Sequence, residues 1–201
     1  MKKLESTLPN MVLSLVGICT LVAAILAFLN DATKGPIEEA QVKNKIAAIK
    51  AVTPQFDNNP YEETFKVALA AGDSLVVYPA KKGGQLVGYA IETNTKAGFN
   101  GFIELMMGVD VQGKLIDYSV LNISETPGLG SKIPEWFHTP AKTSGSIQDV
   151  RGVNLVQEMP LKVKKDGGKV DAITAATISS RAFLDALTRG YEAFKQAQDK
   201  N

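Results

Sequence analysis

The sequence predicts an α+β fold, in which an N-terminal transmembrane helix precedes a domain built on an antiparallel sheet. Three observations lead to this prediction. An uncharged apolar run near the N-terminus is long enough to cross a bilayer. Four strand-like runs then follow one another with glycine-containing turns between them, which is typical of an antiparallel meander and not of a βαβ series. A helix with one apolar face closes the chain.

The apolar run occupies residues 11–29 and contains 19 residues without a charge. At about 1.5 Å per residue it spans about 28 Å, close to the hydrocarbon thickness of a bilayer. The alternative is a secretory signal peptide, but no A-x-A-like cleavage site follows Leu29 closely, so we expect a retained anchor. Because Lys2 and Lys3 precede the run, residues 1–10 are expected in the cytoplasm and the domain on the outer face.

Residues 30–54 are predicted to form an amphipathic helical connector. Ile37, Val42, Ile46 and Ile49 recur at helical spacing. The helix is expected to stop near Thr53, because a residue before proline disfavours the helical conformation. The remaining residues, 55–201, are assigned to one domain, which opens with a loop over residues 55–64.

Strands are predicted over residues 74–80, 85–93, 101–109 and 114–123, with turns at 82–84 and 111–113. A further turn at 166–168 is expected to join two short strands over 161–165 and 169–173. The closing helix is predicted over about 179–196. Its apolar stripe is interpreted as core packing and consists of Phe183, Leu184, Leu187, Tyr191 and Phe194.

The composition excludes several classes of function. A net charge of +1 and the lack of a basic cluster give no argument for nucleic-acid binding. The single cysteine, Cys19, excludes an internal disulfide and a multi-cysteine zinc or iron–sulfur site. The single histidine, His138, has no second histidine to share a metal, so no metal site is predicted. No G-x-G-x-x-G segment opens a helix after a strand, which excludes the usual dinucleotide site.

The segment before the closing helix is rich in hydroxyl groups. Thr174, Thr177, Ser179 and Ser180 place four hydroxyls within seven residues, at or just before the helix start. Free backbone N–H groups and the positive end of the helix dipole favour a phosphate at such a place. Serine and threonine also suit helix starts as capping residues without any ligand. These residues alone leave both interpretations open.

A second segment, Glu-Thr-Pro-Gly-Leu-Gly at residues 125–130, follows the fourth predicted strand directly. Two glycines around one leucine, after Thr-Pro, predict a tight turn. The backbone amides of such a turn can approach a planar ligand closely. Taken alone, the segment also fits an ordinary surface turn.

Residues 171–177 resemble the Asp-x-x-(Ser/Thr)-Gly-Ala-Thr motif of the covalent FMN-binding domain family, in which the last threonine is esterified to the phosphate of FMN. The resemblance implies FMN as the cofactor and Thr177 as its covalent attachment point. It also implies cofactor-binding roles for Asp171, Thr174 and Ala176. One position departs from the motif, because Ala175 stands where the family usually has glycine.

Residues 125–130 resemble a loop of the same family that lines the isoalloxazine ring. The resemblance implies that this loop binds the cofactor. A histidine that the family usually has shortly before the glutamate is absent, since Ser124 stands there. Residues 96–101 and 108–114 resemble further glycine-containing pieces, and the matches cover about residues 85–195 in the family's order. The implied cofactor-binding residues of the loop are Glu125, Thr126, Gly128, Leu129 and Gly130.

Within this family, the length and the single anchor resemble the G subunits of Rnf electron transport complexes, which are ion-translocating ferredoxin:NAD⁺ oxidoreductases. That resemblance implies a flavoprotein subunit in the inner membrane of a bacterium, which relays electrons among other membrane and cytoplasmic subunits and has no substrate site of its own. Three alternatives are the C subunit of a sodium-translocating NADH:quinone oxidoreductase, a structural subunit with a decayed flavin site, and a free-standing flavin reductase.

Overall fold

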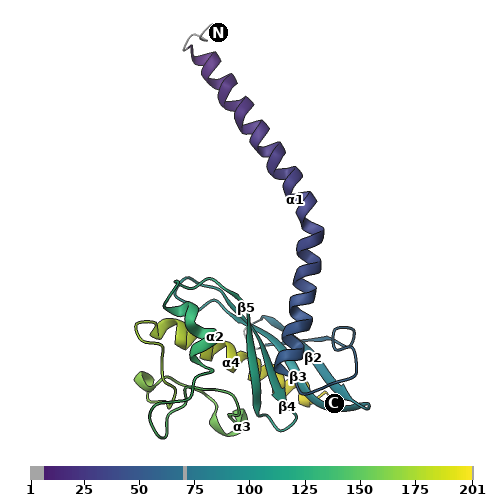
Figure 1. Ribbon diagram of the computed structural model, residues 1–201, viewed down its shortest axis with the longest axis vertical. Helices are drawn as coiled ribbons and strands as arrows, with labels where there is room; N and C mark the ends of the chain where they lie inside the picture. Colours follow the sequence, from purple (N-terminus) through teal and green to yellow (C-terminus); the bar gives the residue numbers. More distant parts are fainter. Residues whose placement is uncertain (1–6, 70–71, 201) are drawn as a thin grey trace. The chain divides into compact units, whose positions relative to one another are not determined.

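The computed structural model describes residues 7–69 and 72–200. Its longest element is helix α1, Leu8–Val52, which is followed by a five-stranded sheet and a closing helix (Figure 1). The chain divides into one unit that ends at Lys43 and a second unit that begins at Asn44. The predicted α+β class is confirmed.

The first unit consists of the N-terminal part of α1. The predicted apolar run lies in this part, and the helix is 45 residues long with Pro36 inside it. Within the described ranges, α1 is the one helix long and apolar enough to cross a membrane, and its most apolar stretch is fully exposed in the chain. A single-pass membrane anchor is consistent with these properties. The helix continues without a break through the predicted connector and ends at Val52, next to the expected stop at Thr53.

The sheet belongs to the second unit. Its strands lie in the order in which they occur in the chain, and each pairs antiparallel with the next, which confirms the predicted meander. Gly83 and Gly84 form the turn between the second and third strands, with φ values of 59° and 77°. Two positive φ values are typical of the tight hairpin turn that matches the strand twist. The strands are β1 Phe65–Ala68, β2 Ser74–Lys82, β3 Gln85–Thr95, β4 Ile103–Asp110 and β5 Leu115–Ile123.

Helix α4, Thr177–Gln198, packs on one face of this sheet and closes the main core. It confirms the predicted closing helix and extends it by two residues at each end. Phe183, Leu187 and Phe194 of its apolar stripe are fully buried. Gly190 lies where the helix crosses β4, since a Cβ added there would stand 2.7 Å from Cε of Met107. The predicted stripe is therefore core.

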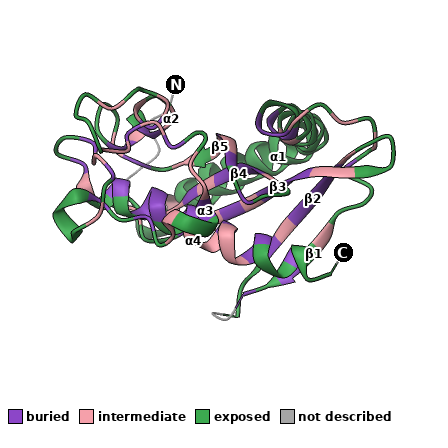
Figure 2. Cartoon of the chain, turned by 90° about the horizontal axis from the view of Figure 1, so that it is seen from below, coloured by how far each residue is buried: buried purple, intermediate pink, exposed green. Residues whose placement is uncertain are grey.

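The last turns of α1, from Asn44 onward, cover the opposite face of the sheet. Ala48, Ile49 and Val52 pack there in a smaller core with Tyr78 and Met106. Figure 2 shows buried residues along the strands on which the two helices pack. Of the apolar positions that predicted the connector helix, Ile37, Val42 and Ile46 are exposed, so only the end of the expected apolar face is buried.

The chain between β5 and α4 is mostly irregular. It contains only short helical pieces, and the strands predicted over 161–165 and 169–173 are not formed. Val170 donates its N–H to the carbonyl of Lys162, and its own carbonyl accepts from the N–H of Lys164. Lys169 and Asp171, on either side of Val170, bond instead to Ile147, so the two segments do not pair along their length as strands. The turn predicted at 166–168 is present, with Gly167 at φ 79°. The helical pieces are η1 Gly130–Lys132, α2 Ile133–Trp136, α3 Leu155–Glu158 and η2 Lys164–Asp166.

Candidate functional site

The predicted loop after β5 and the start of α4 face each other across a cavity of about 360 Å³. That volume lies within the range of about 300–1,000 Å³ that is usual for small-molecule sites. The fold thus brings together two segments that are separated by about 50 residues in the chain. The lining residues are Phe99, Glu125, Thr126, Leu129, Gly130, Lys165, Ala175, Ala176, Thr177, Ile178 and Ser179.

The start of α4 lacks the side-chain cap that its hydroxyl-rich sequence suggests. The N-cap residue is Ala176, which has no capping group, and Thr177 is the first helical residue. The Ser180 hydroxyl accepts from the N–H of Ile173 and donates to the carbonyl of Ala176. The Ser179 hydroxyl donates to a carboxylate across the cavity. The polar N–H end of the helix therefore faces the cavity without a side-chain partner from the N-cap.

A lysine lies directly beside Thr177. Nζ of Lys165, from η2, is 3.4 Å from Oγ1 of Thr177 and donates to it. Both side chains line the cavity. A cation and a helix N-terminus therefore meet at one hydroxyl, and this combination attracts an anion.

Glu125 is the buried carboxylate of the site, with only 7% of its surface exposed. Its Oε2 accepts a hydrogen bond of 2.6 Å from the Ser179 hydroxyl, and its Oε1 accepts from the N–H of Asn100 at 3.4 Å. Gly130 permits this arrangement, because a Cβ added there would lie 2.5 Å from Oε2 of Glu125 and from Oγ of Ser179. Glu125 therefore fastens the loop to the first turn of α4.

Ala175 stands where the family motif has glycine, and it adopts a backbone conformation that favours glycine. Its φ is 62°, and it is the one non-glycine residue with a positive φ in the described part of the chain. This left-handed region is unfavourable for a residue with a Cβ. Ala175 thus takes a left-handed conformation although it carries a Cβ.

The rim of the cavity is apolar. Phe99 is 65% exposed, Ile178 47% and Leu129 38%. Three large apolar side chains around one opening form a surface suited to a planar apolar ring. Phe99 and Ile178 were not predicted as site residues. Phe99 lies within one of the glycine-containing pieces, and this position was the only sequence signal for it.

Six of the nine residues predicted to bind the cofactor line the cavity, and three do not. Asp171 and Thr174 line a neighbouring hollow with Trp136, whose indole N–H donates to the Asp171 carbonyl. Gly128 lies in the turn at φ 77° and donates its N–H to the Ser131 hydroxyl. Among the cavity residues that sequence reasoning missed, Lys165 offered the least signal, because it stands in a run of charged residues typical of a solvated turn.

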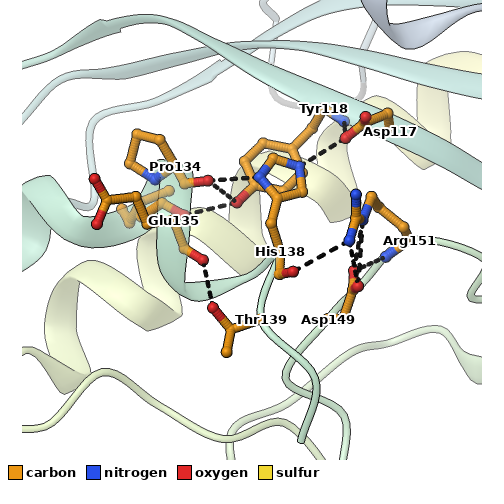
Figure 3. Close-up of polar contacts among 9 residues, drawn as sticks. Asp117, Tyr118, Pro134, Glu135, His138, Thr139, Asp149 and Arg151 are labelled. Carbon is orange, nitrogen blue, oxygen red and sulfur yellow. Dashed lines mark hydrogen bonds and ion pairs between the residues drawn. The ribbon is translucent and has the colours of Figure 1, made fainter.

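A polar cluster anchors the segment that follows the loop (Figure 3). His138 stacks on Tyr118 of β5 with ring centroids 4.3 Å apart, and its Nε2 lies 2.6 Å from Oδ1 of Asp117. Tyr118 donates its hydroxyl to the carbonyl of Ile133 at 2.6 Å. Arg151, which pairs with an aspartate, donates to the His138 carbonyl. His138 is thus a half-buried structural residue that fixes α2 beside β5.

Comparison with known proteins agrees with this site. A family model described as "FMN-binding domain" matches residues 98–192, a range that includes every residue of the cavity lining. The G subunit of the ion-translocating oxidoreductase complex of Stutzerimonas stutzeri is 35% identical over 185 residues, covering 90% of this chain and 78% of the relative. The corresponding protein of Shewanella amazonensis is also 35% identical, covering 88% of this chain and 83% of the relative.

A more distant relative is the G subunit of the Na⁺-translocating ferredoxin:NAD⁺ oxidoreductase complex of Acetobacterium woodii. It is 28% identical over 195 residues, which cover 91% of this chain and 89% of that protein. The similarity to all three relatives covers nearly the whole chain. This chain therefore belongs to the family of G subunits of ion-translocating oxidoreductase complexes, which are FMN-binding, membrane-anchored electron transport subunits.

Proposed function

We propose that this chain relays electrons within an ion-translocating complex through FMN held as a phosphoester on Thr177. The observation that carries the proposal is the position of the Thr177 hydroxyl. It lies in the cavity, at the start of α4, beside the amino group of Lys165. A phosphate esterified at this oxygen meets both the helix N-terminus and a cation.

The cavity also fits the rest of FMN. The exposed side chains of Phe99, Leu129 and Ile178 offer an apolar surface for the isoalloxazine ring. The loop at 125–130 contributes Glu125, Thr126, Leu129 and Gly130 to the lining of the same space. An uncapped helix start next to an apolar rim suits a molecule with a phosphate at one end and an aromatic ring at the other.

When bound, FMN supplies the electron transfer, and the side chains of this chain set its position. Thr177 tethers the cofactor, Glu125 holds the loop against α4, and the apolar rim shields one face of the ring. In the described part of the chain, the cavity lining holds no histidine or cysteine to serve a separate substrate reaction. In this proposal the chain acts as a relay subunit, and substrates of the complex bind to its partners.

The partners are the other membrane and cytoplasmic subunits of an Rnf-type complex. The name of the Acetobacterium woodii relative indicates ferredoxin and NAD⁺ as the substrates of its complex and Na⁺ as its ion. We extend the ferredoxin:NAD⁺ reaction to the complex of this chain. Because Lys2 and Lys3 favour a cytoplasmic N-terminus, the FMN domain lies on the outer face of the membrane. Electrons then cross the bilayer through the partner subunits.

Flavin fluorescence in a denaturing gel tests the proposal. The wild-type band should fluoresce under ultraviolet light because a covalent flavin survives denaturation. The band of Thr177→Ala should be dark, and the band of Thr174→Ala should be weaker than wild type but visible, since Thr174 lies outside the cavity. A fluorescent Thr177→Ala band would contradict the attachment.

One observation favours a second candidate, a structural subunit whose flavin site has decayed. Ala175 stands in the motif where the family usually has glycine, and it is strained there. A wild-type band that is dark after expression in a host that makes covalent flavoproteins would support this candidate.

A further inference from the structure

We propose that Lys165 is the cation that pairs with the phosphate of FMN at Thr177, and that Asp171 acts by positioning this lysine. The inference rests on the proposed function, because it needs a phosphate at Thr177. It assigns a role to a residue outside the family motif and explains why a motif carboxylate lies outside the cavity.

Each of the three residues of η2 binds a different group of partners. Nζ of Lys164 lies 2.6 Å from Oδ1 of Asp171 and 2.7 Å from the Ser146 hydroxyl. Asp166 accepts two hydrogen bonds from Arg181 of α4, at 2.6 and 2.8 Å. These hydrogen bonds hold the pKa of Asp166 below its usual range, so the pair with Arg181 is charged at neutral pH.

Lys165 lies between these two ion pairs in the chain and is the residue that faces the cavity. Its amino group donates to Oγ1 of Thr177, and no carboxylate pairs with it among the residues that the structure describes. Lys164 and Asp166 are fixed on either side, so the backbone that carries Lys165 is held at both ends. The cation is therefore directed at Thr177 before any phosphate is present.

The negative charges of the site would also be stabilised by a nearby cation. Glu125 lines the same cavity as a buried carboxylate. A phosphodiester on Thr177 adds a second negative charge, and like charges in a partly buried site repel. The helix N-terminus contributes only about half a positive charge. Lys165 supplies a full charge and leaves the ion pairs of its two neighbours intact.

This arrangement gives Asp171 a role at a distance. Its carboxylate does not line the cavity but binds Lys164, and the Asp171 backbone is fixed by its bonds to Ile147 and Trp136. Asp171 is thus a positioning residue that acts through η2. The motif aspartate and the motif threonine are connected by Lys164 and Lys165.

The experiment compares Lys165→Gln, Lys165→Glu and Lys165→Arg in the full-length chain, expressed with its partner subunits. Lys162→Gln is the matched control, because it removes one positive charge three residues away. The Lys162 side chain lines a different hollow, together with Arg181 and Leu184. Flavin occupancy is measured by intact mass spectrometry. The phosphorus NMR resonance of the loaded protein reports the surroundings of the phosphate, and circular dichroism checks folding.

We expect Lys165→Gln to lower the ratio of loaded to unloaded chain by about tenfold, the factor expected for a charge-assisted hydrogen bond. Lys165→Glu should lower it further, and Lys165→Arg should restore most of it. Asp171→Asn should lower the ratio in a chain with Lys165 and change it little in the Lys165→Gln chain, and an equal fall in both would contradict the positioning role of Asp171. The phosphorus resonance should move in the remaining loaded Lys165→Gln protein and stay unchanged in Lys162→Gln.

Two results would overturn the inference and leave the proposed function standing. One is an equal flavin occupancy in the wild-type chain and the Lys165→Glu chain. The other is a fall in occupancy with no movement of the phosphorus resonance, which would mean that Lys165 affects loading without touching the phosphate. A wild-type chain that carries no flavin would instead contradict the proposed function.

Discussion

The carboxylate of Glu125 and the hydroxyl of Ser179 are joined by a buried hydrogen bond of 2.6 Å. Glu125 begins the loop after β5, and Ser179 lies in the first turn of α4. Their contact closes one wall of the cavity and fixes the distance between the two segments that the family resemblance identified separately. Gly130 leaves room for both side chains, and Gly98 leaves room for the other oxygen of Glu125.

Ser179→Ala should destabilise the domain by about 1–3 kcal/mol, because it leaves a buried carboxylate short of a donor. Urea denaturation followed by circular dichroism measures the loss. In a Glu125→Gln background the same substitution should cost less, since a neutral amide is less expensive to leave under-bonded. Equal costs in the two backgrounds would show that the two side chains are not coupled.

Ala175→Gly should stabilise the domain by about 1 kcal/mol, because glycine adopts the left-handed region without the strain that a Cβ imposes. The matched control is Ala176→Gly. Ala176 has φ −132°, where glycine gains nothing and loses conformational entropy, so this change should be destabilising. Thermal melts of the two variants should therefore shift in opposite directions. A fall in melting temperature for Ala175→Gly would contradict the strain.

Glu104→Gln should raise stability at neutral pH. Burial is the main cause that raises the pKa of Glu104, and the nearby Glu92 raises it further. A carboxyl whose pKa is raised by folding costs stability once the pH is high enough to ionise it, and costs nothing where it is protonated in both states. The gain over wild type should therefore be present at pH 7 and vanish below about pH 4. The exposed Glu62→Gln serves as the control, and a gain independent of pH would contradict the prediction.

The transmembrane arrangement predicts which side a protease can reach. If the FMN domain lies on the outer face, protease added to intact spheroplasts should remove the full-length fluorescent band. Inverted membrane vesicles should protect the same band. A cytoplasmic protein, measured in the same samples, controls for lysis. Protection in spheroplasts together with digestion in inverted vesicles would place the domain in the cytoplasm.

The sequence predicted the elements whose signals are local. The uncharged run, the four longer strands and α4 were found because each shows a hydrophobic period or a glycine turn within a few residues. The edge strand β1 was missed because it is only four residues long, too short for its alternation of apolar and polar or exposed residues to stand out from the sequence. The hairpin predicted around 166–168 was wrong in its strands and right in its turn. The residues on the two sides of the turn do not form one continuous ladder, because Lys169 and Asp171 bond to Ile147.

The site residues, like the secondary-structure elements, were predictable where a local sequence pattern marks them. Thr177 and the loop at 125–130 were found through their resemblance to family motifs, and most of these residues do line one cavity. Lys165, Phe99 and Ile178 were missed because their roles depend on how three distant segments meet. No local pattern distinguishes Lys165 from Lys164, and only the structure shows that Lys164 pairs with Asp171 while Lys165 faces the cavity.

The most direct test of the account is to locate the flavin on the chain. Trypsin should release residues 170–181, which contain Thr174, Thr177, Ser179 and Ser180 as the hydroxyl-bearing residues. Fragmentation of this peptide by tandem mass spectrometry should place an added FMN phosphoester on Thr177 alone. An adduct on Thr174 or Ser179, or a wild-type peptide that carries no FMN, would contradict the account.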